Sequence, residues 1–264
     1  ADVQVLHGDT AVVPSGGGTG ATRATVVGGS ALYLVAEEAR HKLVSIAAHQ
    51  LGCAEVDVVL EEGQAFSRHD PGRTVAFRDL AAAAYSEEQL PPGVTAGLDF
   101  SGSFTLGQPY QSPHSFSTHV VAVQVNRENG VVEILSYTAI HDCGRILNPM
   151  LVEGQVHGGI AQGIGQALWE GMAYSPDGQP LTASLMDYAM PSAQGLPELN
   201  LDTYETPSPM NPLGIKGVGE LPTVAAPAAV ANAVMDALSG FGVRHIDTPL
   251  TPEKVWNAMQ GAAE

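Results

Sequence analysis

Hydrophobic residues recur every three or four positions between residues 30 and 51, which is the spacing of one face of an α-helix. The apolar residues at this spacing are Leu32, Val35, Ala36, Ala39, Leu43, Ile46 and Ala47. Gly52 follows directly, and glycine is common just past the end of a helix. The pattern therefore predicts a helix over residues 30–51.

Runs rich in β-branched residues predict two β-hairpins. The first is VDVVLEEGQAF, which is expected to turn near Glu62-Gly63. The run that follows, RTVAFRDLAAAAYS, predicts a strand leading into a short helix. The second hairpin is predicted in HVVAVQVNRENGVVEILSYTAIHDCG, because the pair Asn129-Gly130 favours a tight turn. Residues 86–113 are rich in proline and glycine and predict a long surface excursion.

The stretch NPMLVEGQVHGGIAQGIGQALWEGM predicts a helix that is unusually rich in glycine. Its interior glycines include Gly158, Gly159, Gly163 and Gly165. Each costs roughly 1 kcal/mol relative to alanine inside a helix, so the fold is expected to need the close approach that they permit. Tight packing against another helix or a sheet is the simplest explanation.

The predicted elements indicate an α+β fold. Strands and helices are mixed without regular βαβ alternation, which argues against a doubly wound sheet. We expect one region over residues 1–264, with two possible lobes at about 1–113 and 114–264.

The composition describes a folded globular chain and disfavours several classes of partner. Its 264 residues are 44% apolar and 15% charged, which is enough apolar content for a sizeable core. The 11 basic and 28 acidic residues leave a formal net charge of −17, which disfavours nucleic acids and anionic membranes. No apolar stretch has the length of a membrane span and the first residues do not resemble a signal peptide, so a cytoplasmic protein is expected.

Cysteine and histidine show no recognisable pattern of metal ligands. Cys53 and Cys143 lie far apart, so iron–sulfur, zinc-ribbon and disulfide frameworks lack ligands. Four scattered histidines have no recognisable ligand spacing, which disfavours a histidine-bound metal. These are His114, His119, His141 and His157. Cys143 has only Arg145 as a basic neighbour and is not expected to be a nucleophile.

The glycine-rich stretch GGGTGATR lies ahead of the first predicted helix. It fits the dinucleotide-binding pattern weakly, because no strand runs into it and no Lys-Ser/Thr pair follows as in a phosphate loop. Its bare backbone N–H groups, two threonines and Arg23 nevertheless suit an anion. Anion binding and a plain flexible turn both stay open from these residues alone.

Glu220 stands between a glycine-rich turn and LPTVAAPAAVANAV, which predicts a helix. Pro222 suits the first helical position, so an acid here can simply complement the helix dipole, which is worth under about 1 kcal/mol. Such an acid does not need an approach stripped of side chains, as at Gly214, Gly217 and Gly219. These glycines favour the docking of a bulky group, over which a carboxylate can act as a general base.

Several linked motifs in this order resemble the carboxy-terminal half of the molybdenum-binding subunit of molybdenum hydroxylases. They are HDCGRILNPMLVEGQVHGGIAQGIGQALWEG, LMDYAMPSA, ETPSPMNPLGIKGVGE and APAAVANAVMDAL, and the opening GDTAVVPSGGGTGATRATVVGG also fits. The chain is most similar to the aerobic carbon monoxide dehydrogenase and aldehyde oxidoreductase branch of the xanthine oxidase family. The resemblance implies an oxidoreductase with a molybdopterin cofactor, often a cytosine dinucleotide in bacteria, that hydroxylates a carbon centre with oxygen from water.

The resemblance also implies roles for individual residues. Glu220, the acid of the G-V-G-E motif, would be the base that deprotonates the metal-bound hydroxyl as it attacks the substrate. Gln155 would hydrogen-bond near the pterin or the molybdenum oxo group, and the molybdenum would be held through the pterin and by no side chain. The other cofactor-binding residues would be Thr19, Ala21, Thr22, Arg23, Ala24 and Thr25 in the glycine turn, and Lys216, Gly217, Val218 and Gly219 beside Glu220.

Only part of such an enzyme is expected in this chain, which is either a split subunit or a portion of a longer one. The amino-terminal half of the molybdenum subunit, an iron–sulfur subunit and a flavin subunit carrying FAD are the expected partners, because hydroxylation releases two electrons. The substrate, an aldehyde, carbon monoxide or an N-heterocycle, is not specified. Two other functions stay open: a non-catalytic nucleotide- or anion-binding module that uses residues 16–25, and a structural protein whose glycines serve packing.

Overall fold

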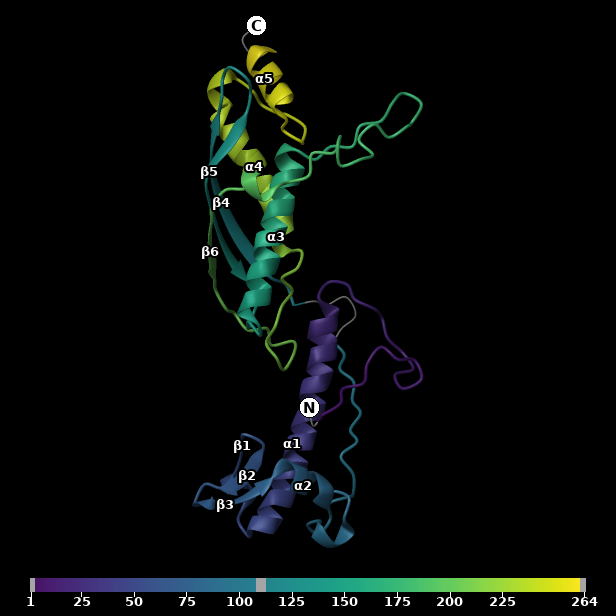
Figure 1. Cartoon of the computed structure of the whole chain (residues 1–264). Coiled ribbons are helices and arrows are strands. Elements are labelled where there is room, and N and C mark those ends of the chain that lie inside the picture. The colour runs from purple at the N-terminus through teal and green to yellow at the C-terminus, as the bar shows by residue number, and fades with distance from the viewer. Residues whose placement is uncertain (1–2, 108–112, 262–264) are drawn as a thin grey trace. The chain divides into compact units, whose positions relative to one another are not determined.

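The computed structural model describes residues 3–107 and 113–261, and the chain divides into two compact units, Ala1–Leu106 and Gly107–Glu264. Each unit combines helices with a small sheet (Figure 1). The predicted α+β class is therefore confirmed.

The first unit contains a long helix and an antiparallel sheet in the order β1-β2-β3. Its elements are a π-helical turn (Ala24–Gly29), α1 (Ser30–Leu51), a 3-10 turn (Glu55–Asp57), β1 (Val58–Glu61), β2 (Gln64–Ser67), β3 (Asp70–Ala76), α2 (Phe77–Ala83) and a second 3-10 turn (Glu87–Gln89). Left-handed backbone at Glu62 and Gly63 makes the predicted turn between β1 and β2. Buried residues of α1, β2 and α2, among them Ile46, Ala65 and Leu80, form the core of this unit.

Helical backbone begins earlier than the apolar spacing predicts. The residues Ala24–Gly29 form a π-helical turn that runs into α1 without a break, and Gly29 itself has helical φ and ψ values of −63° and −38°. The Ser30 hydroxyl donates to the Val26 carbonyl at 2.5 Å and joins the two parts. Ala24 and Thr25, which we expected in the glycine turn, therefore belong to the start of the helical segment.

The second unit contains a sheet in the order β4-β5-β6 and the helices α3, α4 and α5. Its elements are β4 (Phe116–Val125), β5 (Val132–Asp142), α3 (Pro149–Leu168), a 3-10 turn (Ala193–Gly195), β6 (Leu199–Thr203), α4 (Leu221–Ala237), another 3-10 turn (Ser239–Phe241) and α5 (Pro252–Gly261). β4 and β5 form the hairpin predicted at Asn129-Gly130, and β6 pairs with β5 in parallel. The helices predicted over the glycine-rich stretch and after Glu220 are confirmed as α3 and α4.

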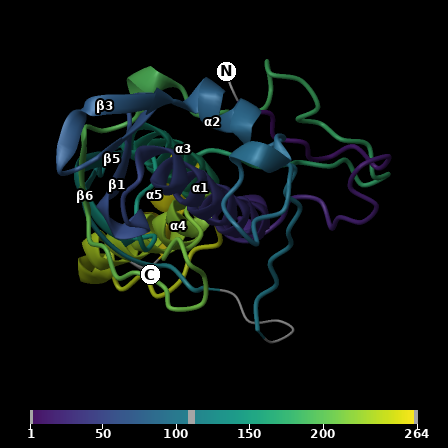
Figure 2. The same ribbon diagram turned by 90° about the horizontal axis from the view of Figure 1, so that it is seen from below.

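Helices cover one face of this second sheet. Tyr137 and Ala139 of β5 are fully buried and share a core with residues of α3, α4 and α5, and Figure 1 shows α3 and α4 on this side. On the opposite face, Phe116 and Ile140 have 64% and 46% of their surface exposed. The loop over residues 172–192 extends away from the sheet and helices of this unit in both views (Figures 1 and 2).

The glycines of α3 fall into two groups. A Cβ on Gly159 or Gly163 would lie 2.9 Å or 2.4 Å from side-chain atoms of α4, and a Cβ on Gly165 would lie 2.4 Å from Pro191. Tight packing, as predicted, explains these three. A Cβ on Gly158 would meet no atom within 4 Å, so packing within the described part of the chain does not explain that glycine.

Candidate functional site

Glu220 is an exposed residue directly before α4, and Pro222 follows in the first turn of that helix. The position agrees with the predicted helix start. The carboxylate makes no capping hydrogen bond to the helix. A helix-start acid stabilises a helix through such a bond or through the dipole, so only the dipole interaction supports a purely structural role.

Gln155 of α3 lies beside the loop that carries Glu220. A Cβ on Gly219 would lie 3.3 Å from the Gln155 Oε1 atom, so the carboxamide reaches this loop and a side chain at residue 219 would crowd it. Gly154 and Gly158, one helical turn apart, are both exposed, and an added Cβ on either would meet nothing within 4 Å. Gln155 thus has an open glycine position on either side of it in α3, and its carboxamide reaches Gly219, the residue before Glu220.

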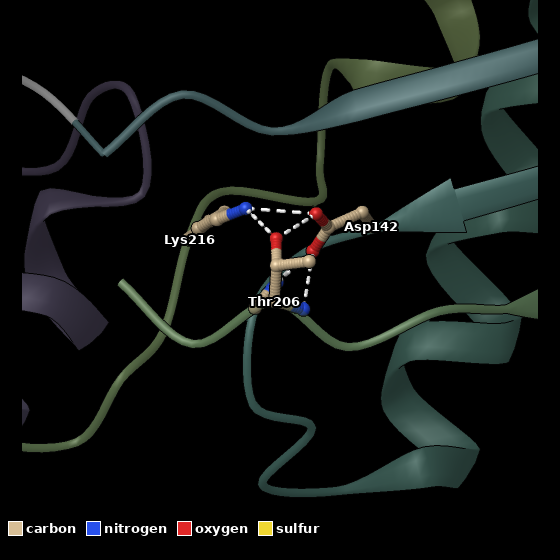
Figure 3. A network of polar contacts seen from close by, with 4 residues as sticks. Asp142, Thr206 and Lys216 are labelled. Atoms are coloured by element: carbon tan, nitrogen blue, oxygen red, sulfur yellow. Dashed lines mark hydrogen bonds and ion pairs between the residues drawn. The ribbon is translucent and has the colours of Figure 1, made fainter. Parts of the chain in front are cut away.

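Lys216 also belongs to this loop, and its ammonium group is turned toward Asp142 (Figure 3). Its Nζ donates to the Asp142 Oδ2 at 2.8 Å and to the Thr206 Oγ1 at 2.5 Å, while the Thr206 hydroxyl donates to the same carboxylate. Only 8% of the Lys216 side chain and 13% of the Asp142 side chain are exposed. Burial acts to raise the pKa of Asp142, but the hydrogen bonds from Lys216, Thr206 and backbone N–H groups outweigh it and lower the pKa to about 2. The Lys216 side chain is thus engaged within the chain.

The glycine turn of the first unit has an unusual backbone. Gly18, Ala21 and Thr22 have positive φ values of 67°, 46° and 59°. Such values are uncommon for residues other than glycine, and for a β-branched threonine they store strain on the order of 1–3 kcal/mol. Of the predicted cofactor-binding residues here, Thr22 is partly exposed and the others are exposed, namely Thr19, Ala21, Arg23, Ala24 and Thr25. Strained backbone of this kind is concentrated at functional sites, which keeps the anion-binding prediction open.

A chain of hydrogen-bonded polar side chains, not predicted from the sequence, lies on the core face of the β4–β5 hairpin; Tyr137 and His141 are buried and His119 is partly buried. The Tyr137 hydroxyl lies 2.8 Å from the His119 Nδ1, and the His119 Nε2 lies 3.0 Å from the His141 Nε2. Burial lowers the pKa of His119, and burial together with the neighbouring His119 lowers the pKa of His141 to about 4. The Nδ1 of His141 is buried and has no hydrogen-bond partner among the described residues. Both imidazoles are therefore neutral near pH 7.

Cys143 is buried, and burial raises the pKa of its thiol. A protonated, inaccessible thiol is a poor nucleophile, in agreement with the sequence analysis. Within residues 3–107 and 113–261, no group of three or more His, Cys, Asp and Glu side chains is arranged to hold a metal ion. The helices of those same residues are all too short or too polar to cross a membrane.

Comparison with known proteins places this chain in a family. Residues 1–197 match the molybdopterin cofactor-binding domain. The chain therefore belongs to the family of molybdopterin cofactor-binding domains, and the resemblance to the molybdenum-binding subunits of molybdenum hydroxylases is confirmed.

Individual relatives refine this assignment. The chain is 39% identical over 247 residues to the nicotine 6-hydroxylase large subunit of Paenarthrobacter nicotinovorans, covering 93% of this chain and 30% of that protein. It is 35% identical to the carbon monoxide dehydrogenase large chain of Hydrogenophaga pseudoflava, covering 98% and 32%. Among solved structures, quinoline 2-oxidoreductase from Pseudomonas putida 86 matches with a TM-score of 0.81 and 35% identity, covering 92% and 30%. The chain thus spans about a third of the length of these relatives.

The described residues fit a bulky phosphate-containing cofactor. Such a group needs hydrogen-bonding partners, backbone that can be approached closely and a place for negative charge. The second unit offers the Gln155 carboxamide with open space above Gly154 and Gly158. The first unit offers an exposed, glycine-rich turn with Arg23. Each of these features, taken by itself, is of a kind that a pterin nucleotide can use.

Proposed function

We propose that this chain is the cofactor-holding part of a molybdenum-dependent hydroxylase or dehydrogenase that oxidises a carbon centre with oxygen from water. The observation that carries the proposal is the approach of the Gln155 carboxamide to Gly219, the residue directly before the uncapped Glu220, next to the open positions Gly154 and Gly158 of α3. Family membership supports the same function. A module that uses only the turn of residues 16–25 leaves these residues without a role, so we favour the enzyme.

The cofactor in this proposal is molybdopterin in its cytosine dinucleotide form, with molybdenum held through the pterin. The Gln155 carboxamide would hydrogen-bond to the cofactor, and residues 216–219 would lie along it. Residues 19–25 would hold the phosphate through backbone N–H groups, hydroxyls and Arg23. When bound, the cofactor supplies a two-electron acceptor and a centre that acidifies water.

Glu220 would act as the general base. The start of α4 favours a negative charge, and the carboxylate is exposed and free of a capping hydrogen bond, so it can reach a group docked at the open positions of α3. Its oxygen would accept the proton of the water-derived hydroxyl as that oxygen attacks the substrate carbon.

Further chains or domains would complete the enzyme in the cytoplasm. We propose the other half of the molybdenum subunit, an iron–sulfur subunit and a flavin subunit, since two electrons must leave the site at each turnover. The names of the relatives, a large subunit and a large chain, support a multi-subunit assembly. Those names refer to nicotine, carbon monoxide and quinoline, which supports an N-heterocycle or carbon monoxide as substrate, with an aldehyde as the third class.

The substitution Glu220→Gln in the complete complex tests this function. The amide has the same shape, and the residue is exposed, so we expect the fold and the molybdenum content to be kept. Turnover should fall by roughly 10²- to 10⁴-fold, which is the usual contribution of a general base. Molybdenum content, melting temperature and rate are measured on the same preparation.

Glu253 provides the matched control, because it is an exposed acid in the first turn of α5. Glu253→Gln removes a helix-start charge of the same kind and should leave turnover unchanged, with a stability loss under about 1 kcal/mol. If Glu220→Gln behaves like this control, with full molybdenum and near wild-type turnover, Glu220 is not the base.

A further inference from the structure

The segment that leads to Glu220 is fastened to the end of β5 by backbone hydrogen bonds. The Arg145 N–H donates to the Gly214 carbonyl at 2.9 Å, and the Lys216 N–H donates to the Cys143 carbonyl at 2.8 Å. Within the segment, the Asn211 side chain donates to the Ile215 carbonyl and accepts from its N–H, at 2.9 and 3.1 Å. Residues 211–216 are therefore held against residues 143–145, directly after the end of β5.

The Asp142 carboxylate is the centre of the side-chain contacts at this junction (Figure 3). It accepts from the backbone N–H of Gly144 at 2.9 Å and of Thr206 at 3.2 Å, in addition to the Lys216 ammonium and the Thr206 hydroxyl. Thr206 thus contacts the carboxylate through its backbone and its hydroxyl, and it also accepts from Lys216. One largely buried carboxylate, 13% exposed, joins the end of β5 to both ends of the segment 206–216.

On the other side of Glu220, the chain is held by α3. The Pro222 ring and the Thr223 side chain pack where a Cβ on Gly159 would lie, and the Thr223 hydroxyl donates to the Gly159 carbonyl at 3.3 Å. Between this contact and Lys216 lie residues 217–221, which include Glu220 itself and the two glycines Gly217 and Gly219. Glycine adds backbone freedom, so the direction of the Glu220 side chain depends on the two anchors at either end.

We propose that Asp142, Thr206 and Lys216 act as positioning residues that hold the Glu220 carboxylate in its working place. This inference rests on the proposed function for the role of Glu220. In it, the Lys216 side chain serves the loop instead of contacting the cofactor. A general base must stay within hydrogen-bond reach of the proton that it accepts, and a displacement of about 1 Å can cost on the order of 10²-fold in rate.

The pair Thr206→Val and Thr206→Ser in the complete complex tests the proposal. Valine keeps the shape and the backbone N–H but removes the hydroxyl that bridges Lys216 and Asp142, whereas serine keeps the hydroxyl. For Thr206→Val we expect kcat to fall by roughly 10- to 100-fold with KM and molybdenum content unchanged. Amide hydrogen exchange over residues 206–219 should become faster. Thr206→Ser should keep kcat and the exchange rates at their wild-type values. The control Thr138→Val makes the same change on the exposed face of β5 and should alter neither kcat nor exchange.

The outcomes separate this inference from the proposed function. If Thr206→Val leaves both kcat and exchange unchanged, or speeds exchange without lowering kcat, the positioning role is wrong, while the Glu220→Gln result still decides the base. A rise in KM or a loss of molybdenum, with kcat unchanged, also overturns the positioning role. The network would then serve substrate or cofactor binding. Loss of kcat with rescue by serine supports it.

Discussion

Helix α3 has a side that packs against α4 and a side that is open, and glycine occurs on both. On the packed side, a Cβ on Gly159 or Gly163 would overlap atoms of α4. On the open side, a Cβ on Gly154 or Gly158 would meet nothing within 4 Å. Each glycine carries a similar helical cost of about 1 kcal/mol. A glycine that packing does not require is therefore a stronger reason to expect a ligand than the glycine content of the helix as a whole.

Substitution on the packed side should have the largest effect on stability. A Cβ on Gly163 would lie 2.4 Å from the Ala226 Cβ and 2.9 Å from the Pro227 Cδ. We expect Gly163→Val to lower the free energy of unfolding by roughly 1–3 kcal/mol, because the added atoms force α3 and α4 apart. Urea unfolding measures the change. Unaltered stability would show that the two helices are not packed as closely as described.

The imidazole pair His119 and His141, on the core face of the β4–β5 hairpin, should make the free energy of unfolding sensitive to acid. Burial lowers the pKa of His119 and, with His119 as a second cause, lowers that of His141 from 6.5 to about 4. In the folded protein these imidazoles stay neutral, whereas in the unfolded chain they take up protons below pH 6.5. Their contribution to the free energy of unfolding is therefore fully present above that pH and is lost as the pH falls toward 4. Each such proton contributes a slope of about 1.4 kcal/mol per pH unit.

Free energies of unfolding between pH 7 and pH 4 test this expectation. His141→Gln should reduce the slope, while His157→Gln, which changes an exposed histidine of α3, should keep it. Equal slopes in the wild type and in His141→Gln would mean that the imidazole pair is not the acid-sensitive group.

Substitution on the open side should have the smallest effect on stability and the opposite sign. Gly158→Ala adds a methyl group to free space, so we expect the chain to gain up to about 1 kcal/mol from the better helix former. In the complete complex the same methyl group should reduce molybdenum content, because it occupies the surface proposed for the cofactor. Full molybdenum content in Gly158→Ala would show that the cofactor does not lie against the open side of α3.

Local patterns account for most elements of the fold. The helix ending at Gly52, the turn at Asn129-Gly130 and the helix after Glu220 each depend on residues close in sequence, and each is found where predicted. The first helix has the predicted bounds, Ser30–Leu51, but the π-helical turn Ala24–Gly29 that runs into it was not predicted. Local features drew attention to Glu220 and to the glycine turn, whereas the role of Gln155 follows only from the family resemblance, since no local rule assigns one.

The long-range polar contacts were not predictable in the same way. Lys216 and Asp142 are 74 positions apart, and nothing local in either stretch specifies the other. The proximity of His119 and His141 could have been predicted in part. Both residues lie at a similar distance from the predicted turn, which brings them to the same part of one hairpin. The register, which pairs His119 with Ala139, includes a bulge that places the two imidazoles on the same face, and that shift is not visible in the sequence.

The parallel pairing of β5 with β6 bears on the order in which this unit forms. Residues 143–198 separate the two strands, whereas β4 and β5 are joined by a short turn. Closing so long a crossover loses chain entropy before the strand contacts form, so we expect the hairpin to appear first during folding and β6 to dock later. The segment with Glu220 follows β6 in the chain, and on a translating ribosome it emerges after the hairpin is already exposed. Glu220, the residue proposed for proton transfer, is therefore expected to be among the last of the second unit to reach its native surroundings.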